Sequence, residues 1–182
     1  MEGHAQGQEL FNQACYWHQQ QQLDKAEQLY RQAVEADQGL VDGYRNLGAL
    51  LRQLGRPEEG LVFQRKAVEL KPDDPGLQGN LGNVLRDLGH LTESRMAFEK
   101  AITLAPEMSG PHLGLAITLN AMREHEVVIE KIGRFLVTFQ TSENKKDASQ
   151  LLLELGNAYQ QVGKIEDALG YWRKSQELID EG

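Results

Sequence analysis

The 182-residue sequence contains a single cysteine, Cys15, so no disulfide can form within the chain. A chain of this kind is typical of a reducing compartment, and we expect a cytoplasmic protein. No apolar run approaches the roughly 20 residues that a membrane-spanning helix requires. The first residues, Met1 to Gln6, lack the basic and apolar regions of a secretory signal. The composition therefore argues against a disulfide scaffold, a membrane protein and a secreted one.

Positive charge is also in short supply. The 19 Lys and Arg residues stand against 27 Asp and Glu residues, which gives a formal net charge of −8. General nucleic-acid binding needs cations that neutralise phosphates, so we expect no nucleic-acid partner. Hydrophobic residues make up 40% of the chain and charged residues 25%, which is typical of a folded protein.

Motifs of catalysis and cofactor binding are missing as well. The sequence has no HExxH, no Walker-type loop, no GxGxxG and no EF-hand spacing. Cys15 and His18 are three residues apart, which on a helix would place a nucleophile or half a metal site on one face. A nucleophile needs an orienting third group and a metal needs further ligands, so we interpret the pair as a surface feature without chemistry. We predict no catalytic site, no metal and no cofactor.

What the sequence does contain is a strict period. Asn12, Asn46 and Asn80 are 34 residues apart, and their surroundings repeat with them. Asn46-Leu47-Gly48 returns as Asn80-Leu81-Gly82, and Leu54-Gly55 returns as Leu88-Gly89. A fixed period of this length indicates one supersecondary unit stacked on copies of itself.

Each repeat reads as two helices joined by a turn. Apolar residues recur at helical spacing through the first half of each repeat, and a second apolar stripe follows. Between the stripes stand Gly55, Gly89 and Gly163, where we expect left-handed helix caps. Pro72 and Pro106 follow the second stripe and should end those helices. Nothing alternates with a period of two, so the pattern predicts an all-α fold of helix–turn–helix units.

These residues resemble the tetratricopeptide repeat (TPR) family over residues 7–182. The last repeat carries the family pattern as Leu152, Leu155, Gly156, Tyr159, Gly163, Ala168 and Trp172. The resemblance implies an α-solenoid of five TPR units that form a right-handed superhelix with a concave groove. It also implies the following organisation: an N-terminal tail at 1–6, TPR 1 at 7–40, TPR 2 at 41–74, TPR 3 at 75–108, a divergent TPR 4 at 109–148 and TPR 5 at 149–182.

TPR 4 departs from the pattern. It has Ala116 where glycine is usual, Val128 where a small residue packs, and Gln140 where proline would fall. Six residues are inserted within the polar stretch 141–147. We expect a longer loop or an extended helix end there, with a local bend of the solenoid as the alternative.

In TPR proteins the first helix of each unit lines the groove. At the groove slots of TPR 1 to TPR 3 the family frame places amides and arginines, and we predict that these bind a peptide: Asn12, Arg45, Asn46, Arg52, Asn80, Asn83 and Arg86. The asparagines resemble the asparagine ladder of O-GlcNAc transferases, in which an amide can pair with both groups of a peptide unit. Gly114 and Glu154 occupy this slot in TPR 4 and TPR 5, where the groove is expected to be apolar with amides. The alternative is that these asparagines only suit a solvated helix or local packing.

The expected function is therefore a non-catalytic protein–protein interaction scaffold that binds an extended peptide segment of a partner. The alternative is a substrate-recognition TPR domain of a larger glycosyltransferase-type enzyme whose catalytic part is absent from this chain. A co-chaperone clamp is disfavoured, because Phe11 and Gly76 stand where that family carries lysines. Apolar residues near the end of the chain, Tyr171, Leu178 and Ile179, also suggest a homodimer through the terminal repeat.

Overall fold

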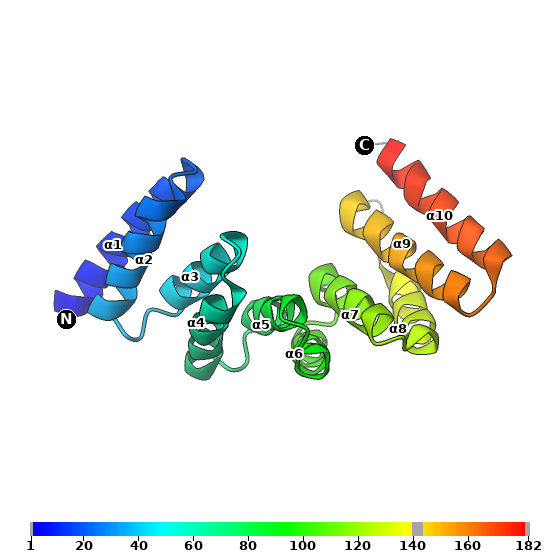
Figure 1. The fold of residues 1–182 in the computed structure, drawn as a ribbon, viewed down its shortest axis with the longest axis horizontal. Coiled ribbons are helices and arrows are strands. Elements are labelled where there is room, and N and C mark those ends of the chain that lie inside the picture. The colour runs from blue at the N-terminus through cyan, green and yellow to red at the C-terminus, as the bar shows by residue number, and fades with distance from the viewer. Residues whose placement is uncertain (1, 140–143, 181–182) are drawn as a thin grey trace. The chain divides into compact units, whose positions relative to one another are not determined.

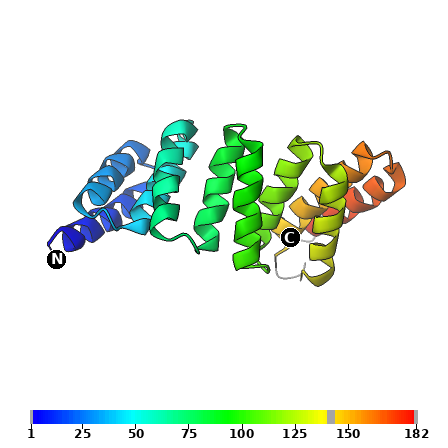
Figure 2. The ribbon, with the colours of Figure 1, turned by 90° about the horizontal axis from the view of Figure 1, so that it is seen from below.

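The computed structural model describes residues 2–139 and 144–180, and the regular structure in them is entirely helical (Figures 1 and 2). Within the units, neighbouring helices pack as helix–turn–helix pairs, α1 with α2, α3 with α4, α7 with α8 and α9 with α10, which confirms the predicted all-α, TPR-like solenoid. The helices are α1 (Glu2–Gln19), α2 (Leu23–Ala36), α3 (Val41–Gln53), α4 (Pro57–Leu70), α5 (Pro75–Asp87), α6 (Leu91–Leu104), α7 (Ser109–Ala121), α8 (His125–Thr138), α9 (Lys145–Gln161) and α10 (Ile165–Asp180).

The chain divides into two compact units. The N-terminal unit is Met1–Leu88 and holds α1 to α5, and the C-terminal unit is Gly89–Gly182 and holds α6 to α10. The division falls inside the stretch predicted as TPR 3, between α5 and α6. Each unit is described by itself below.

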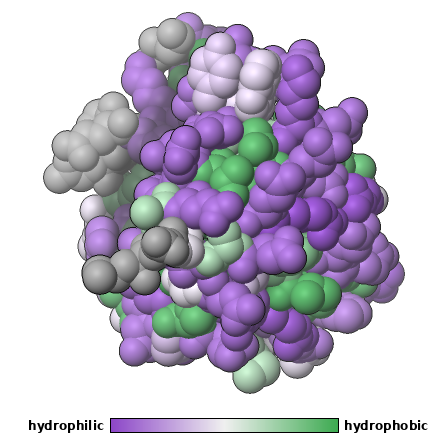
Figure 3. Space-filling view, turned by 90° about the vertical axis from the view of Figure 1, so that its left-hand side faces the viewer, coloured by the Kyte–Doolittle hydropathy of each residue, from purple (hydrophilic) through white to green (hydrophobic). Residues whose placement is uncertain are grey.

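The core of the N-terminal unit lies between the paired helices. Its buried side chains come from all five helices, α1 to α5, and include Ala14, Tyr30, Leu47, Ala67 and Leu77. These are the positions of the helical apolar stripes, so burial of one stripe per helix holds the pairs together. The face seen in Figure 3 is mainly hydrophilic, with hydrophobic residues in small separate groups.

Helix α1 begins earlier than expected. Residues 2–6, predicted as a tail, belong to the helix, which starts at Glu2. Two contacts with the end of α2 explain this extension. His4 Nδ1 lies 2.7 Å from Asp37 Oδ2, and Gly7 lies so close to Asp37 that a Cβ there would be 2.6 Å from the Asp37 Cβ. The hydrogen bond from His4 is the main reason why the pKa of Asp37 is lowered.

The three predicted glycine caps are confirmed. Gly55, Gly89 and Gly163 have φ of 74°, 76° and 80°, the left-handed conformation that costs glycine little. The same slot in the first and fourth repeats holds Gln21 at φ 58° and Arg123 at φ 63°. The left-handed turn is thus kept at each of these five equivalent positions, although two of them hold a residue that is strained there.

The C-terminal unit is built around a second apolar cluster. Phe98, Leu115, Leu119, Ile132 and Leu151 are buried in it and come from α6, α7, α8 and α9. Each of these helices contributes one side of the cluster, as in the N-terminal unit.

Helix α9 takes up part of the predicted insertion. It has 17 residues, whereas α3, α5 and α7 have 13 each, and the extra turn is at its start. The Asn144 side chain caps this turn by accepting a hydrogen bond from the Asp147 amide. Residues 145–147 therefore form an extended helix end, one of the two expected outcomes. Gln140 and residues 141–143 lie outside the described residues.

Candidate functional site

The seven predicted site residues all lie on first helices of the N-terminal unit. Asn12 and Arg52 are exposed, and the other five are half-buried. None is fully buried, so each is accessible to a partner. By helix, they are Asn12 on α1, then Arg45, Asn46 and Arg52 on α3, and Asn80, Asn83 and Arg86 on α5.

Polar bonds between neighbouring first helices hold this face together. His18 Nε2 on α1 lies 3.3 Å from Gln53 Oε1 on α3. One repeat later, the Arg52 guanidinium on α3 donates to the Asp87 carboxylate on α5. The two pairs occupy equivalent positions, 34 residues apart, so one type of polar link joins α1 to α3 and α3 to α5. We refer to this surface of α1, α3 and α5 as the amide face.

The arginines of the amide face are already paired with acids. Arg45 Nη2 lies 3.0 Å from Asp42 Oδ1, and Asp87 faces both Arg52 and Arg86. Their charges are therefore largely balanced within the unit. A partner carboxylate would have to compete with Asp42 and Asp87 for these guanidinium groups.

Asn46 is the most constrained of the predicted residues. Its Nδ2 donates to the Tyr30 hydroxyl at 3.4 Å and approaches Cys15 Sγ at 3.7 Å, and its Oδ1 accepts from Arg45 Nε at 3.4 Å. An amide has two donor hydrogens and two acceptor lone pairs, so much of its capacity is used within the protein. Gripping a peptide unit would require Asn46 to exchange one of these bonds.

Tyr30 is the centre of this network. Its hydroxyl donates to Cys15 Sγ at 3.4 Å and lies 3.4 Å from His18 Nδ1. Burial raises the pKa of Tyr30 above its ordinary value, and the bond to Cys15 adds to the shift. Cys15 and His18 thus both bond to a neutral phenol. In the described part of the chain, no group of three His, Cys, Asp or Glu side chains is arranged to hold a metal ion.

The slot of Asn46 is filled differently in the C-terminal unit. There Gly114 takes the place of asparagine, and the buried Phe98 ring lies against it. A Cβ built on Gly114 would lie 2.3 Å from Phe98 Cε1 and Cζ. Phe98 occupies the same repeat position as Tyr30, and its ring leaves no room for a side chain at Gly114.

The C-terminal unit has a polar hollow of its own, with a volume of about 610 Å³. Asn120 Nδ2 donates to Glu154 Oε2 at 2.8 Å and to the Glu154 carbonyl at 3.1 Å, which joins α7 to α9. His125 Nδ1 lies 3.2 Å from Asn120 Oδ1. The complete lining is Asn120, Arg123, His125, Glu154, Asn157, Gln160 and Gln161.

The set of predicted site residues does not include this hollow, because it follows the asparagine period, which is confined to the first three repeats. On α9 the residues that line the hollow are Glu154 and the expected amides Asn157, Gln160 and Gln161. The signal was present, since amides recur on the first helices of the last two repeats. It was weak because the asparagine period itself ends at Gly114.

Sequence models of repeats match much of the chain. Two models, both described as tetratricopeptide repeat, match residues 11–75 and 76–108, which together exceed half of the sequence. The chain belongs to the tetratricopeptide repeat family. No curated protein sequence matches it.

Solved structures of similar fold cover nearly all of this TPR chain. MamA has a TM-score of 0.80 at 20% identity, over 92% of this chain and 95% of that one. PilW, described as a widely conserved type IV pilus biogenesis factor, has a TM-score of 0.82 at 19% identity, over 96% and 78%. YrrB, described as a TPR protein with an unusual peptide-binding site, has a TM-score of 0.74 at 17% identity, over 93% and 84%. At these identities the likeness shows the fold. Among the described residues, no helix of the chain is both long and apolar enough to cross a membrane.

Proposed function

We propose that this TPR protein is a scaffold that binds an extended segment of a partner protein on its first helices. The observation that carries the proposal is the presence of accessible amides on first helices of each unit. Asn80 and Asn83 lie half-buried on α5, and Asn157, Gln160 and Gln161 line the hollow on α9. Side-chain amides offer a donor and an acceptor together, which suits a peptide backbone whatever its side chains.

A protein of the same fold supports peptide binding as the type of function. YrrB is described as having a peptide-binding site, and it shares the fold over most of both chains. If the chain is instead a substrate-recognition domain of a transferase, it would bind the substrate protein on the same surface. The proposal therefore concerns what this surface binds and applies to both functions. Because Arg45, Arg52 and Arg86 are paired with acids, we expect main-chain contacts to matter more than the charge of the peptide.

Selection from a random peptide library, followed by binding measurements with variants, tests the proposal. Peptides selected on the intact chain should lose about tenfold in affinity for Asn80→Ala/Asn83→Ala or for Asn157→Ala/Gln160→Ala, because each change removes backbone hydrogen bonds. The matched control is Gln28→Ala/Gln32→Ala, which deletes two exposed amides from the second helix α2. Equal binding by all three double variants would refute the role of the first helices.

Self-association through the terminal repeat is a second proposal for a partner. Helix α10 exposes Ile165, Leu169 and Ile179 to 50%, 51% and 59%. Burying such side chains is favourable, so a second copy of the chain is a plausible occupant of this face. Sedimentation of the chain over a range of concentrations tests this: a monomer throughout would exclude the dimer, and Leu169→Glu should shift any dimer toward monomer.

A further inference from the structure

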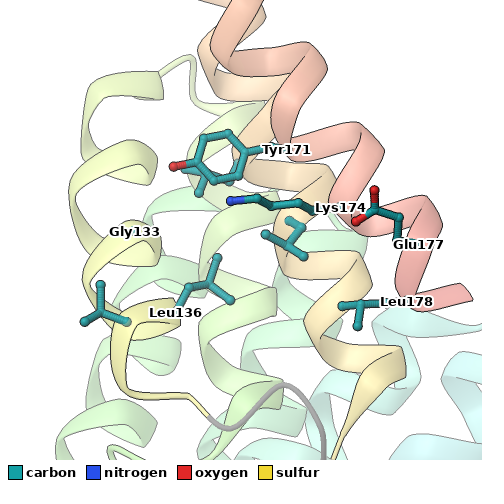
Figure 4. Close-up of a pocket in the computed structure, with 9 residues that line it drawn as sticks. Gly133, Leu136, Tyr171, Lys174, Glu177 and Leu178 are labelled. Carbon is teal, nitrogen blue, oxygen red and sulfur yellow. The ribbon is translucent and has the colours of Figure 1, made fainter. Parts of the chain in front are cut away.

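Two clefts in the C-terminal unit occupy equivalent places in successive repeats. One lies between α6 and α8 over α7, and its lining includes Glu99, Ile102, Leu115, Lys131 and Arg134. The other lies between α8 and α10 over α9, has a volume of about 390 Å³ and is drawn in Figure 4. The helices correspond at offsets of 34 and 40 residues, so each residue of the first cleft has a counterpart in the second. We call them the α6/α8 cleft and the α8/α10 cleft.

Ion pairs neutralise the cations of the α6/α8 cleft. Lys131 Nζ on α8 lies 3.1 Å from Glu99 Oε1 on α6, so this pair bridges the two walls. Arg134 Nη2 lies 3.1 Å from Glu130 Oε1 on the same helix. Both cationic groups therefore have an acidic partner, and one of the pairs spans the cleft.

The α8/α10 cleft lacks both acids. Gly133 stands in the place of Glu99 and Gly170 in the place of Glu130, while Tyr171 replaces Lys131. One of the two cations is retained, because Lys174 is the counterpart of Arg134. The second cleft therefore keeps one cation and lacks these two carboxylates, and the acid in its lining is Glu177, in the place of Val137.

Lys174 points into this cleft. Its Nζ lies 5.7 Å from the centre of the Tyr171 ring, and in Figure 4 the amine is directed toward Tyr171. The acid of the lining is Glu177, and its carboxylate lies at the opposite end of the Lys174 side chain from the amine (Figure 4). No ion pair of Lys174 is present among residues 89–139 and 144–180.

The rest of the lining is apolar. Leu136 comes from α8, and Leu152 and Leu155 form the floor on α9. Val137, where the preceding cleft has Thr103, is 85% exposed at the rim. Transfer of an apolar side chain onto this surface is favourable, and an unbalanced ammonium beside it attracts an anion.

We propose that the α8/α10 cleft binds the C-terminal residue of a partner protein when that residue is large and apolar. The side chain packs on Leu136, Leu152 and Leu155, and the terminal carboxylate pairs with Lys174. A terminal residue fits because it carries both groups on one Cα. In an extended segment the neighbouring side chain points to the opposite side, so an adjacent acidic residue would face away from the lysine. This site is walled by second helices and does not depend on the amide face or the polar hollow.

The probe is the peptide acetyl-Gly-Ser-Gly-Leu with a free carboxylate, compared with its C-terminal amide. Each is titrated to millimolar concentration into the ¹⁵N-labelled intact chain and followed by NMR. The acid peptide should shift the amide signals of α8 and α10 around the cleft and bind about tenfold more tightly than the amide, which is the effect of one charge-assisted bond. Equal affinity for the two peptides, shifts confined to other surfaces, or no binding would each overturn the proposal.

Variants of the cleft make the test specific. Gly133→Glu restores the acid of the α6/α8 cleft and should abolish binding of the acid peptide. A Cβ at Gly133 meets nothing within 4 Å, so Gly133→Ala should fold and retain binding. Lys174→Gln should lower the affinity for the acid peptide to that for the amide peptide. Arg134→Gln, in the other cleft, should leave the affinities for both peptides unchanged. Loss of binding in Arg134→Gln, or its retention in Gly133→Glu with an unchanged melting curve, would contradict the assignment.

Discussion

The Tyr30 hydroxyl accepts a hydrogen bond from Asn46 Nδ2 at 3.4 Å, across the junction of the first two repeats. Sixteen residues separate the two, and the same step in the C-terminal unit joins Phe98 to Gly114. The Tyr30 hydroxyl is bonded to asparagine, whereas the Phe98 ring, which lacks a hydroxyl, fills the slot against glycine. Part of the asparagine period therefore reflects packing between repeats.

We predict that Asn46→Ala destabilises the protein by about 1 kcal/mol, because it removes a hydrogen bond to a buried hydroxyl. Asn12→Ala, at the same slot of the first repeat, should change the stability little, since Asn12 is exposed and its bond is to the exposed Gln8. Urea denaturation of both variants measures the difference. Equal midpoints for the two would mean that the Tyr30 bond contributes nothing.

Tyr30 should make the protein less stable at high pH. Because burial raises its pKa in the folded state, the unfolded chain loses this proton first as the pH passes about 10. The stabilising contribution is therefore complete below that pH and is lost progressively above it. In Tyr30→Phe we expect a shallower fall in the urea midpoint between about pH 8.5 and 11. Some decline remains, since burial also raises the pKa of Tyr171. Parallel declines in the variant and the parent would contradict the assignment to Tyr30.

The turn residue of the first repeat offers a route to higher stability. Gln21 has φ of 58°, at the slot where Gly55 has 74°. Replacing it by glycine relieves a backbone strain of about 1 kcal/mol. Glycine also raises the conformational entropy of the unfolded chain, which offsets part of this gain, so Gln21→Gly should stabilise the fold by about 0.5 kcal/mol. The reverse change, Gly55→Ala, should destabilise by about 1 kcal/mol through backbone strain alone, as a Cβ there meets no atom within 4 Å. Calorimetric melting of both variants tests the pair; the same sign of change in both would be inconsistent with it.

Much of the fold is contained in the period of the sequence. The recurring Leu-Gly pairs and apolar stripes identify paired helices, and the caps at Gly55, Gly89 and Gly163 are confirmed. The early start of α1 was not predictable from periodicity, because it rests on a contact between His4 and Asp37 that are 33 residues apart. Periodicity predicts that each helix exists, but it does not predict where a helix begins when a long-range contact determines its end.

The candidate site was predictable only as a set of slots. Sequence position placed Asn46 and Asn80 on first helices, but the partner of Asn46 is Tyr30 on a second helix. The pairing of Arg52 with Asp87 likewise depends on how neighbouring helices are aligned. The repeat position of a residue predicts the helix on which its side chain lies. The hydrogen bonds and ion pairs of that side chain depend on packing between repeats.

The Phe98–Gly114 contact leads to the last prediction. Extending the asparagine series by Gly114→Asn should destabilise the protein by about 1–3 kcal/mol, since a Cβ would lie 2.3 Å from a ring that is 1% exposed and cannot move aside freely. Gly110→Asn on the same helix is the matched control. A Cβ at Gly110 meets nothing within 4 Å, so this variant should keep the parent's stability within about 0.5 kcal/mol. In Gly114→Asn/Phe98→Ala the clash is removed, and the cost of the asparagine should be smaller than in the Phe98 background. A double-mutant cycle from urea denaturation measures this coupling, and simple additivity would show that Phe98 does not determine the glycine.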